Sequence, residues 1–123
     1  MRDHPNALLL REAGEAMRQG DIEKLDALVA DEIVWHAIGQ PEPVVGKDAL
    51  RGSMATVDYE IDFTNHDVIA NDEHGVALVE AVATRGENKL TYRTAEIYHL
   101  RDGKITERWA FSDDTAAIVD FFK

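Results

Sequence analysis

Apolar and polar residues alternate with two different periods along this chain, and the change of period marks a change of structure. From residue 6 to residue 19 the apolar positions recur every three or four residues, which predicts a helix that Asn6 caps and Gly20 ends. A second apolar face follows Asp21, a residue that favours helix N-termini. The beginning of the chain therefore predicts two consecutive helices.

The middle of the chain switches to a pattern typical of strands. Residues 33–38 form a β-rich run that ends at Gly39. The loop that follows contains Pro41 and Pro43, which we expect to prevent regular strand pairing there. A short helix is expected after Gly46, where apolar residues again recur at helical spacing.

Residues 58–112 are expected to form four long strands, after which Asp113 and Asp114 precede a short amphipathic helix. Consecutive strands joined by short turns form an antiparallel meander, and the chain shows no alternation of single strands and helices. We therefore predict an α+β fold, in which helices cover one face of a curved antiparallel sheet, in a single domain of residues 1–123. The expected turns lie at residues 71–75, 85–89 and 101–104.

Charge and composition narrow the classes of partner. Of the 123 residues, 13 are Lys or Arg and 24 are Asp or Glu, so the net charge is −11. Such a chain is repelled by nucleic-acid backbones and anionic membranes, so we expect it to bind neither. The sequence contains no cysteine, which excludes disulfides and thiol chemistry. With no pattern of a signal peptide or a membrane span, a cytoplasmic location is expected.

Four segments carry a resemblance to a known superfamily. They are QGDIEKLDALVADEIVWH, GKDAL, HDVIANDEHGVALVEA and the hairpin IYHLRDGKITERWAFSDD, in this order. The order resembles the cone-shaped superfamily of nuclear transport factor 2, ketosteroid isomerase, limonene epoxide hydrolase and the SnoaL-like polyketide cyclases. The most similar pattern is that of the SnoaL-like, ketosteroid isomerase-related proteins. The resemblance implies an NTF2-like fold whose helices close over the concave face of the sheet, around an apolar pocket for a small apolar ligand.

The hairpin around Gly103 decides which side chains share a face. We expect a three-residue loop that sets residue 100 opposite residue 104 and therefore Glu96 directly opposite Arg108. The same face then carries Tyr92, Thr94, Tyr98, Thr106, Ala110 and Ser112.

The other face of this hairpin is more apolar. A few short helices can cover only one face of a sheet. We therefore expect the face with Trp109 and Phe111 to bind a second copy of the chain, as sheet faces do in related homodimers. The residues assigned to this face are Ala95, Ile97, Ile105, Trp109 and Phe111.

By resemblance to ketosteroid isomerase, three residues are candidates for catalysis. The family's general base stands at the end of the first strand, where this chain has His36, which is either a neutral base or a packed strand residue. The family's protonated carboxyl corresponds to Glu96, but a neighbouring Arg108 favours the ionised form of a carboxyl. Either Arg108 polarises the substrate oxygen, or Glu96 and Arg108 form a structural ion pair.

Further residues are expected to line the pocket, although aromatic strand residues are also common in cores. Ala13 replaces the family's helix tyrosine, and Ala110 replaces an aspartate that epoxide hydrolysis needs, so neither steroid isomerisation nor epoxide hydrolysis is expected. We expect no cofactor, and no metal, because the adjacent His66 and Asp67 point to opposite faces of a strand. The predicted ligand-binding residues are Trp35, Met54, Tyr59, Tyr92, Tyr98, Ala110 and Ser112.

Three functions are compatible with these residues, and the sequence leaves open whether the protein is an enzyme. The first is a cofactor-independent isomerase or cyclase, in which His36 moves a proton on an apolar carbonyl compound and Arg108, Glu96 or a tyrosine polarises its oxygen. The second is a non-catalytic small-molecule binding module, favoured by Ala13 and Ala110. The third, an interaction protein resembling nuclear transport factor 2, has little support.

Overall fold

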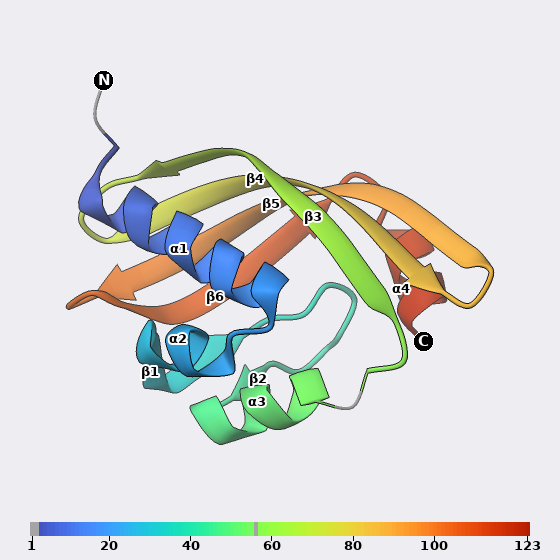
Figure 1. Ribbon diagram of the computed structural model, residues 1–123, viewed down its shortest axis with the longest axis horizontal. Coiled ribbons are helices and arrows are strands. Elements are labelled where there is room, and N and C mark those ends of the chain that lie inside the picture. Colours follow the sequence, from blue (N-terminus) through green and yellow to red (C-terminus); the bar gives the residue numbers. More distant parts are fainter. Residues whose placement is uncertain (1–2, 56) are drawn as a thin grey trace.

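The computed structural model describes residues 3–55 and 57–123, which form four helices and six strands (Figure 1). The helices are α1 (Pro5–Gln19), α2 (Ile22–Ala27), α3 (Lys47–Ala55) and α4 (Thr115–Phe122). The strands are β1 (Val29–Trp35), β2 (Val44–Val45), β3 (Glu60–Ala70), β4 (His74–Arg85), β5 (Asn88–Arg101) and β6 (Lys104–Ser112).

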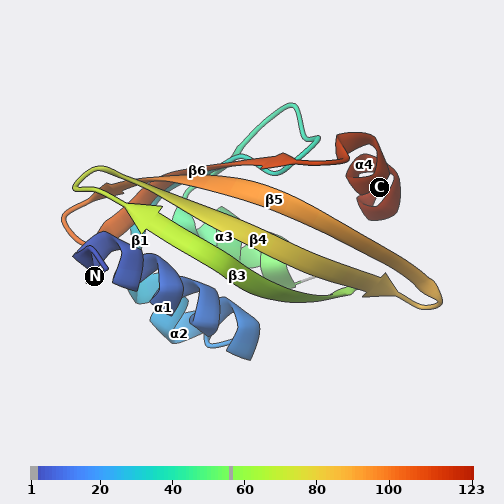
Figure 2. The same cartoon turned by 90° about the horizontal axis from the view of Figure 1, so that it is seen from above.

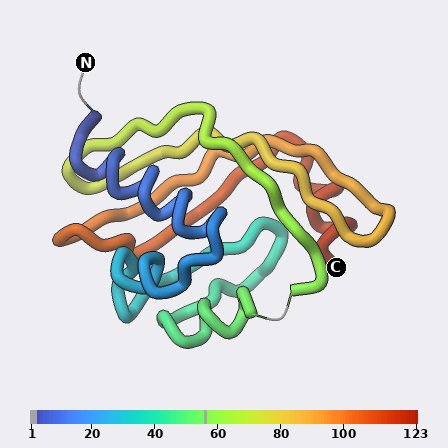
Figure 3. Tube along the Cα trace, in the orientation of Figure 1, coloured from blue at the N-terminus to red at the C-terminus, as the bar shows by residue number. Residues whose placement is uncertain are grey.

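All six of these strands form one curved, open sheet in the order β2-β1-β6-β5-β4-β3. Strands β3 to β6 form the predicted antiparallel meander, whose path Figure 3 traces. Strand β1 pairs with β6 in parallel. Figure 2 shows α1 and α2 on one side of this sheet, which confirms the predicted α+β class. We call this helix-covered side the inner face and the opposite side the outer face.

One strand was not expected. Val44 and Val45 form β2 and pair with the end of β1, so the prediction that the two prolines prevent pairing here is wrong. The paired residues follow Pro43, and both keep the backbone N–H that proline lacks.

The helix ends mostly agree with the sequence pattern. Gly20 ends α1 in a left-handed conformation, with φ of 68°, and its N–H bonds to the last turn. Asp21 caps α2 by accepting a hydrogen bond from the N–H of Lys24, and Asp114 caps α4 in the same way. Helix α1 starts one residue earlier than expected, so its cap is His4 and not Asn6. No helix among the described residues is long and apolar enough to cross a membrane.

Small residues let α1 lie close to the sheet. Its buried face includes Ala13 and Ala16, and it packs on β3 and β4. The inner positions of β4 carry Gly75 and Ala77, followed by further small or β-branched residues, all of them buried. At Gly75 an added Cβ would collide with the side chain of Leu10. The packing therefore depends on small side chains on both elements.

The hairpin between β5 and β6 differs from the prediction. Arg101 lies opposite Lys104, so the loop has two residues, Asp102 and Gly103, both with positive φ, at 52° and 74°. Two consecutive residues with positive φ define the tight turn that twists with the strands. The predicted three-residue loop is wrong because Asp102, like Gly103, accepts the left-handed conformation.

A bulge in β6 then shifts the register. Leu100 lies opposite Ile105, whereas His99 lies opposite Glu107, so Thr106 is an extra residue in β6. Because the two-residue loop sets Ile105 opposite Leu100, Ile105 lies in the core at 2% exposure, and its predicted place on the face with Trp109 is wrong.

Beyond the bulge, Glu96 lies opposite Ala110, and Tyr98 lies opposite Arg108. The expectation that Glu96 and Arg108 are direct cross-strand partners is therefore wrong. The observed register differs from the predicted one by two residues, and side chains alternate with a period of two. Glu96 and Arg108 consequently still share a face, which is the inner one.

Candidate functional site

Four side chains on β5 and β6 form a connected group on the inner face: Thr94, Glu96, Tyr98 and Arg108, which we call the inner polar cluster. Glu96 is its centre. The hydroxyl of Thr94 donates to Glu96 Oε2 at 3.0 Å, and the hydroxyl of Tyr98 donates to Glu96 Oε1 at 2.9 Å. Arg108 Nη2 lies 3.1 Å from the same Oε1. The side chains of Arg108 and Glu96 are only 11% and 16% exposed, so this ion pair is largely shielded from water.

The guanidinium of Arg108 is held from several directions. Its Nη1 donates to the backbone carbonyl of His36 at 3.1 Å, and the ring of Trp35 lies 4.4 Å from the guanidinium carbon. The Nε atom of Arg108 is buried and has no hydrogen-bond partner. An unpaired buried donor is costly, and a ligand oxygen is one group that satisfies it. The cluster therefore contains one buried N–H without a partner, in a guanidinium that lies over the ring of Trp35.

The comparisons with known proteins agree with this arrangement of helices and sheet. A family model described as the SnoaL-like domain matches residues 10–108. The chain belongs to the SnoaL-like family. No curated protein matches it.

Solved structures share the fold of this SnoaL-like chain over nearly its whole length. An NTF2-like protein of unknown function from Burkholderia pseudomallei has 19% identity and a TM-score of 0.84, with 98% of both chains covered. IdmH, a proposed polyketide cyclase from Streptomyces antibioticus, has 18% identity and a TM-score of 0.75 over 96% of this chain and 99% of its own. An epoxide hydrolase of M. tuberculosis has 15% identity and a TM-score of 0.75 over 89% and 83%. These likenesses confirm the NTF2-like fold.

Two tyrosines of the SnoaL-like chain stay neutral beside Glu96. Burial, followed by the charge of Glu96, raises the pKa of Tyr98 well above its usual value near 10. The same causes in the same order raise the pKa of Tyr92 to about 12. Both phenols therefore keep their protons at neutral pH, and Tyr98 acts as a hydrogen-bond donor.

His36 lies apart from the inner polar cluster. Its imidazole stacks on Trp109, with ring centres 5.2 Å apart and the planes within 3° of parallel. Its Nε2 lies 2.8 Å from Glu107 Oε2. Trp109 and Glu107 flank Arg108 in β6, so they and His36 belong to the outer face. The structure therefore brings together Glu96 and Arg108, and places His36 across the sheet from them.

The remaining predicted pocket residues divide into two groups. Trp35, Tyr98 and Ala110 adjoin the inner polar cluster, since Ala110 lies opposite Glu96. The others lie farther along the inner side and contact helices. The rings of Tyr59 and Tyr92 contact the ring of Phe122 of α4 edge-on. The hydroxyl of Ser112 accepts a hydrogen bond from the N–H of Asp114, which caps α4. Met54 of α3 lines a crevice between α3 and α2.

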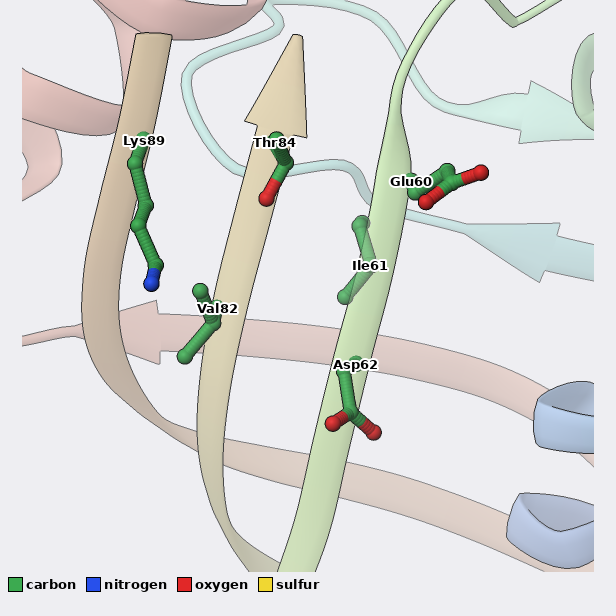
Figure 4. A pocket seen from close by; sticks show the side chains of 6 residues that line it. All are labelled: Glu60, Ile61, Asp62, Val82, Thr84 and Lys89. Atoms are coloured by element: carbon green, nitrogen blue, oxygen red, sulfur yellow. The ribbon is translucent and has the colours of Figure 1, made fainter. Parts of the chain in front are cut away.

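The described surface hollows do not include the inner polar cluster. An open hollow of about 640 Å³ lies at the ends of β3, β4 and β5. Figure 4 shows the side chains that line it. A crevice of about 20 Å³ lies beside α2 and α3, and Met54 is the one predicted residue that lines it. The residues that line the open hollow are Glu60, Ile61, Asp62, Val82, Thr84 and Lys89.

Sequence reasoning missed several participants in these contacts. Thr94 was placed on the correct face but was not proposed as a partner of Glu96, although it lies two residues earlier in the same strand and so on the same side. Glu107 and His99 were not proposed at all, yet their alternation with Arg108 and Tyr98 places them on the outer face beside Trp109. Among the described residues, no three His, Asp or Glu side chains form a group suited to a metal ion.

Proposed function

We propose that this SnoaL-like protein binds a small, mostly apolar carbonyl compound and polarises its oxygen through Arg108. The observation that carries the proposal is the buried Nε of Arg108, which has no partner although the two terminal nitrogens of the guanidinium do. A carbonyl oxygen at this atom gains a charge-assisted hydrogen bond in a shielded site. Trp35 beside the guanidinium supplies apolar contact for the rest of the ligand.

The charges of the cluster favour a neutral ligand. Glu96 already balances the charge of Arg108 at 3.1 Å, so the ion pair as a whole is neutral. A carboxylate or phosphate ligand adds an unbalanced negative charge close to Glu96, which is expensive where water is largely excluded. A ketone, aldehyde or ester accepts the same hydrogen bond without that cost.

Polarisation of a carbonyl supports isomerase or cyclase chemistry without a cofactor. A hydrogen on the carbon next to the carbonyl becomes acidic when a cation stabilises the enolate oxygen. The acceptor of that proton is Glu96, because His36 lies on the outer face. In a β,γ-unsaturated ketone the enolate is conjugated and takes the proton back from Glu96 at the γ carbon, which is isomerisation. Alternatively, its α carbon attacks a second carbonyl of the same molecule, the oxygen of that carbonyl takes the proton from Glu96, and a ring closes.

A non-catalytic binding protein is the second candidate. The two oxygens of Glu96 already accept hydrogen bonds from Thr94 and Tyr98, and one of them forms an ion pair with Arg108, which limits their access to a substrate proton. Ala110, opposite Glu96, provides no acid or base. Binding alone requires only the free N–H of Arg108.

The two candidates are distinguished by one set of measurements on bicyclic enolisable ketones, with 2-tetralone as the probe. Binding is followed by tryptophan fluorescence, since Trp35 contacts Arg108, and catalysis by enzyme-dependent exchange of the ketone's acidic hydrogens in heavy water. Arg108→Gln is expected to lose binding, while Glu96→Gln keeps binding and loses exchange. Arg101→Gln, an exposed arginine on β5, is the matched control.

Each outcome decides one point. Binding with accelerated exchange supports the enzyme, and binding without exchange leaves the binding protein. Binding that Arg108→Gln does not weaken contradicts both forms of the proposal, as does failure of the whole ketone series to bind.

We also propose that the chain forms a homodimer through the outer face. Phe111 of β6 is 61% exposed there, and Leu78 and Ile69 on the adjacent strands β4 and β3, beyond β5, are 36% and 59% exposed. Large apolar side chains on adjacent strands of one sheet face favour association with another surface. A second copy of this chain offers the same face and forms a closed pair about a twofold axis.

A further inference from the structure

Three of the five histidines of the chain lie together on the outer face. We call them, with Glu107, the outer histidine cluster: His36, His74, His99 and Glu107. His36 Nε2 lies 2.8 Å from one oxygen of Glu107, and His99 Nδ1 lies 3.7 Å from the other. The ring of His74 meets that of His99 edge-on, with centres 4.6 Å apart. Strands β5 and β6 and the end of β1 thus bring two imidazoles to one carboxylate, and β4 places the third imidazole beside His99.

The cluster lies among the apolar residues of the outer face. Trp109 stacks on His36 and meets the ring of His99 edge-on, with centres 4.7 Å apart. The side chains of His36 and Glu107 are 33% and 28% exposed, so they are accessible yet partly shielded by their neighbours. A protein that covers Trp109 therefore also covers these imidazoles.

Other charged groups around the cluster have partners or point to solvent. Arg101, on the same face of β5, pairs with Glu32 of β1 at 3.3 Å. In the loop before His74, Asp72 pairs with His4 at 2.9 Å, and Glu73 is exposed. Within the described part of the chain, Glu107 is the carboxylate that lies between the imidazoles.

Protonation therefore changes the charge of this face sharply. With neutral imidazoles the cluster carries the single negative charge of Glu107, to which the N–H of His36 donates. With all three histidines protonated, three positive charges and one negative charge leave +2. Histidine is the side chain whose charge ordinarily changes between pH 5 and pH 8, so pH is the variable that tests the effect of these charges.

We propose that the outer histidine cluster makes the self-association of this chain sensitive to pH. The inference rests on the homodimer proposed above. Two copies associate through the outer face while the imidazoles are neutral, and they separate as the histidines become charged. The physical reason is that an apolar interface must remove water from the charged imidazoles, and that Glu107 compensates only one of them.

A competing effect has the opposite sign. Two copies with a net charge of −11 repel each other near neutral pH, and protonation of histidines lowers that repulsion. Salt weakens the long-range repulsion between the two copies. It has a much smaller effect on the free-energy cost of removing water from a buried imidazolium. At about 0.15 M salt we therefore expect the local effect of the cluster to dominate.

The experiment is sedimentation equilibrium of the full chain at about pH 7.5 and pH 5.5 at constant ionic strength. The dimer dissociation constant of the wild type is expected to rise on the order of tenfold at the lower pH. For the double variant His74→Gln/His99→Gln, the change in the logarithm of the dissociation constant between the two pH values is expected to be less than about a third of that of the wild type. His66→Gln, an exposed histidine of β3 outside the cluster, is expected to behave as the wild type.

The outcomes separate this inference from the homodimer itself. A dimer of equal affinity at both pH values overturns the inference and leaves the homodimer intact. An unchanged pH response in the double variant also overturns it, because other groups then cause the effect. A monomer under all conditions overturns both proposals. Circular dichroism of each variant at both pH values verifies that a lost dimer is not a lost fold.

Discussion

Glu96 and Arg108 form a largely buried ion pair across two strands although their backbones are not opposite each other. Tyr98 is the residue opposite Arg108, and its hydroxyl donates to the same oxygen of Glu96 that the guanidinium contacts. The diagonal pair is therefore reinforced by the side chain between its members, and the three groups act as one unit.

This arrangement predicts a strong energetic coupling between Glu96 and Arg108. Removal of one member leaves the other charge shielded and unpaired, so Glu96→Gln and Arg108→Gln are each expected to lower the free energy of unfolding by about 3–5 kcal/mol. The double-mutant cycle is expected to give a coupling of about 1–3 kcal/mol in urea unfolding.

The control cycle uses Glu80 and Arg93, a pair directly opposite in β4 and β5 whose side chains are 55% and 74% exposed. Exposed pairs contribute about 0.2–1 kcal/mol. Equal coupling in the two cycles would show that burial of the inner polar cluster has no energetic effect.

Tyr92 predicts a loss of stability in alkaline solution. Burial raises its pKa to about 12, whereas the unfolded chain releases the proton near pH 10. The contribution of the neutral phenol is therefore fully present below about pH 10 and is lost as the pH rises toward 12. Tyr92→Phe is expected to weaken the fall in the free energy of unfolding between about pH 10 and 11.5, as measured by urea titration. If the free energy of unfolding of Tyr92→Phe falls with pH as steeply as that of the wild type, groups other than Tyr92 cause the loss of stability.

The close packing of α1 on Gly75 predicts that a larger side chain at this position destabilises the fold. A Cβ at this buried position collides with Leu10 of α1, so Gly75→Ala is expected to destabilise the chain by about 1–3 kcal/mol. Gly52 is exposed within α3 and has no atom within 4 Å of an added Cβ. Gly52→Ala is therefore expected to stabilise the chain by about 0.5–1 kcal/mol. Thermal unfolding of both variants measures the difference, and effects of the same sign would contradict the packing described.

The exposed side chain of Phe111 on the outer face is expected to lie in the interface of the proposed dimer. Phe111→Glu places a charge on the outer face and is expected to convert the proposed dimer to a monomer in light scattering after gel filtration. Leu8→Glu is the matched control, because Leu8 is 54% exposed on α1, which covers the inner face, and Phe111 is 61% exposed on the outer face. Dissociation by the Leu8 variant, with none by the Phe111 variant, would place the interface elsewhere.

Much of the fold was predictable because its signals are local. Helix caps at Asp21 and Asp114, the end of α1 at Gly20 and the turns of the meander each depend on a few consecutive residues. The face that Thr94, Glu96 and Tyr98 share was also predictable, since alternation along one strand is a local rule. Arg108 shares that face because the turn and the bulge each shift the register by one residue. The same rule was available for Trp35 and His36, whose adjacent side chains must point to opposite faces.

The sequence by itself determined the α+β class, the order of the elements other than β2 and the face that Thr94, Glu96 and Tyr98 share, because these follow from periodicity, caps and turns. The tertiary structure alone decided which residues meet. The two-residue turn moved Ile105 into the core, the bulge at Thr106 set Tyr98 opposite Arg108, and the parallel pairing of β1 with β6 brought His36 to Glu107. Register and pairing depend on contacts between distant segments, which no local pattern specifies.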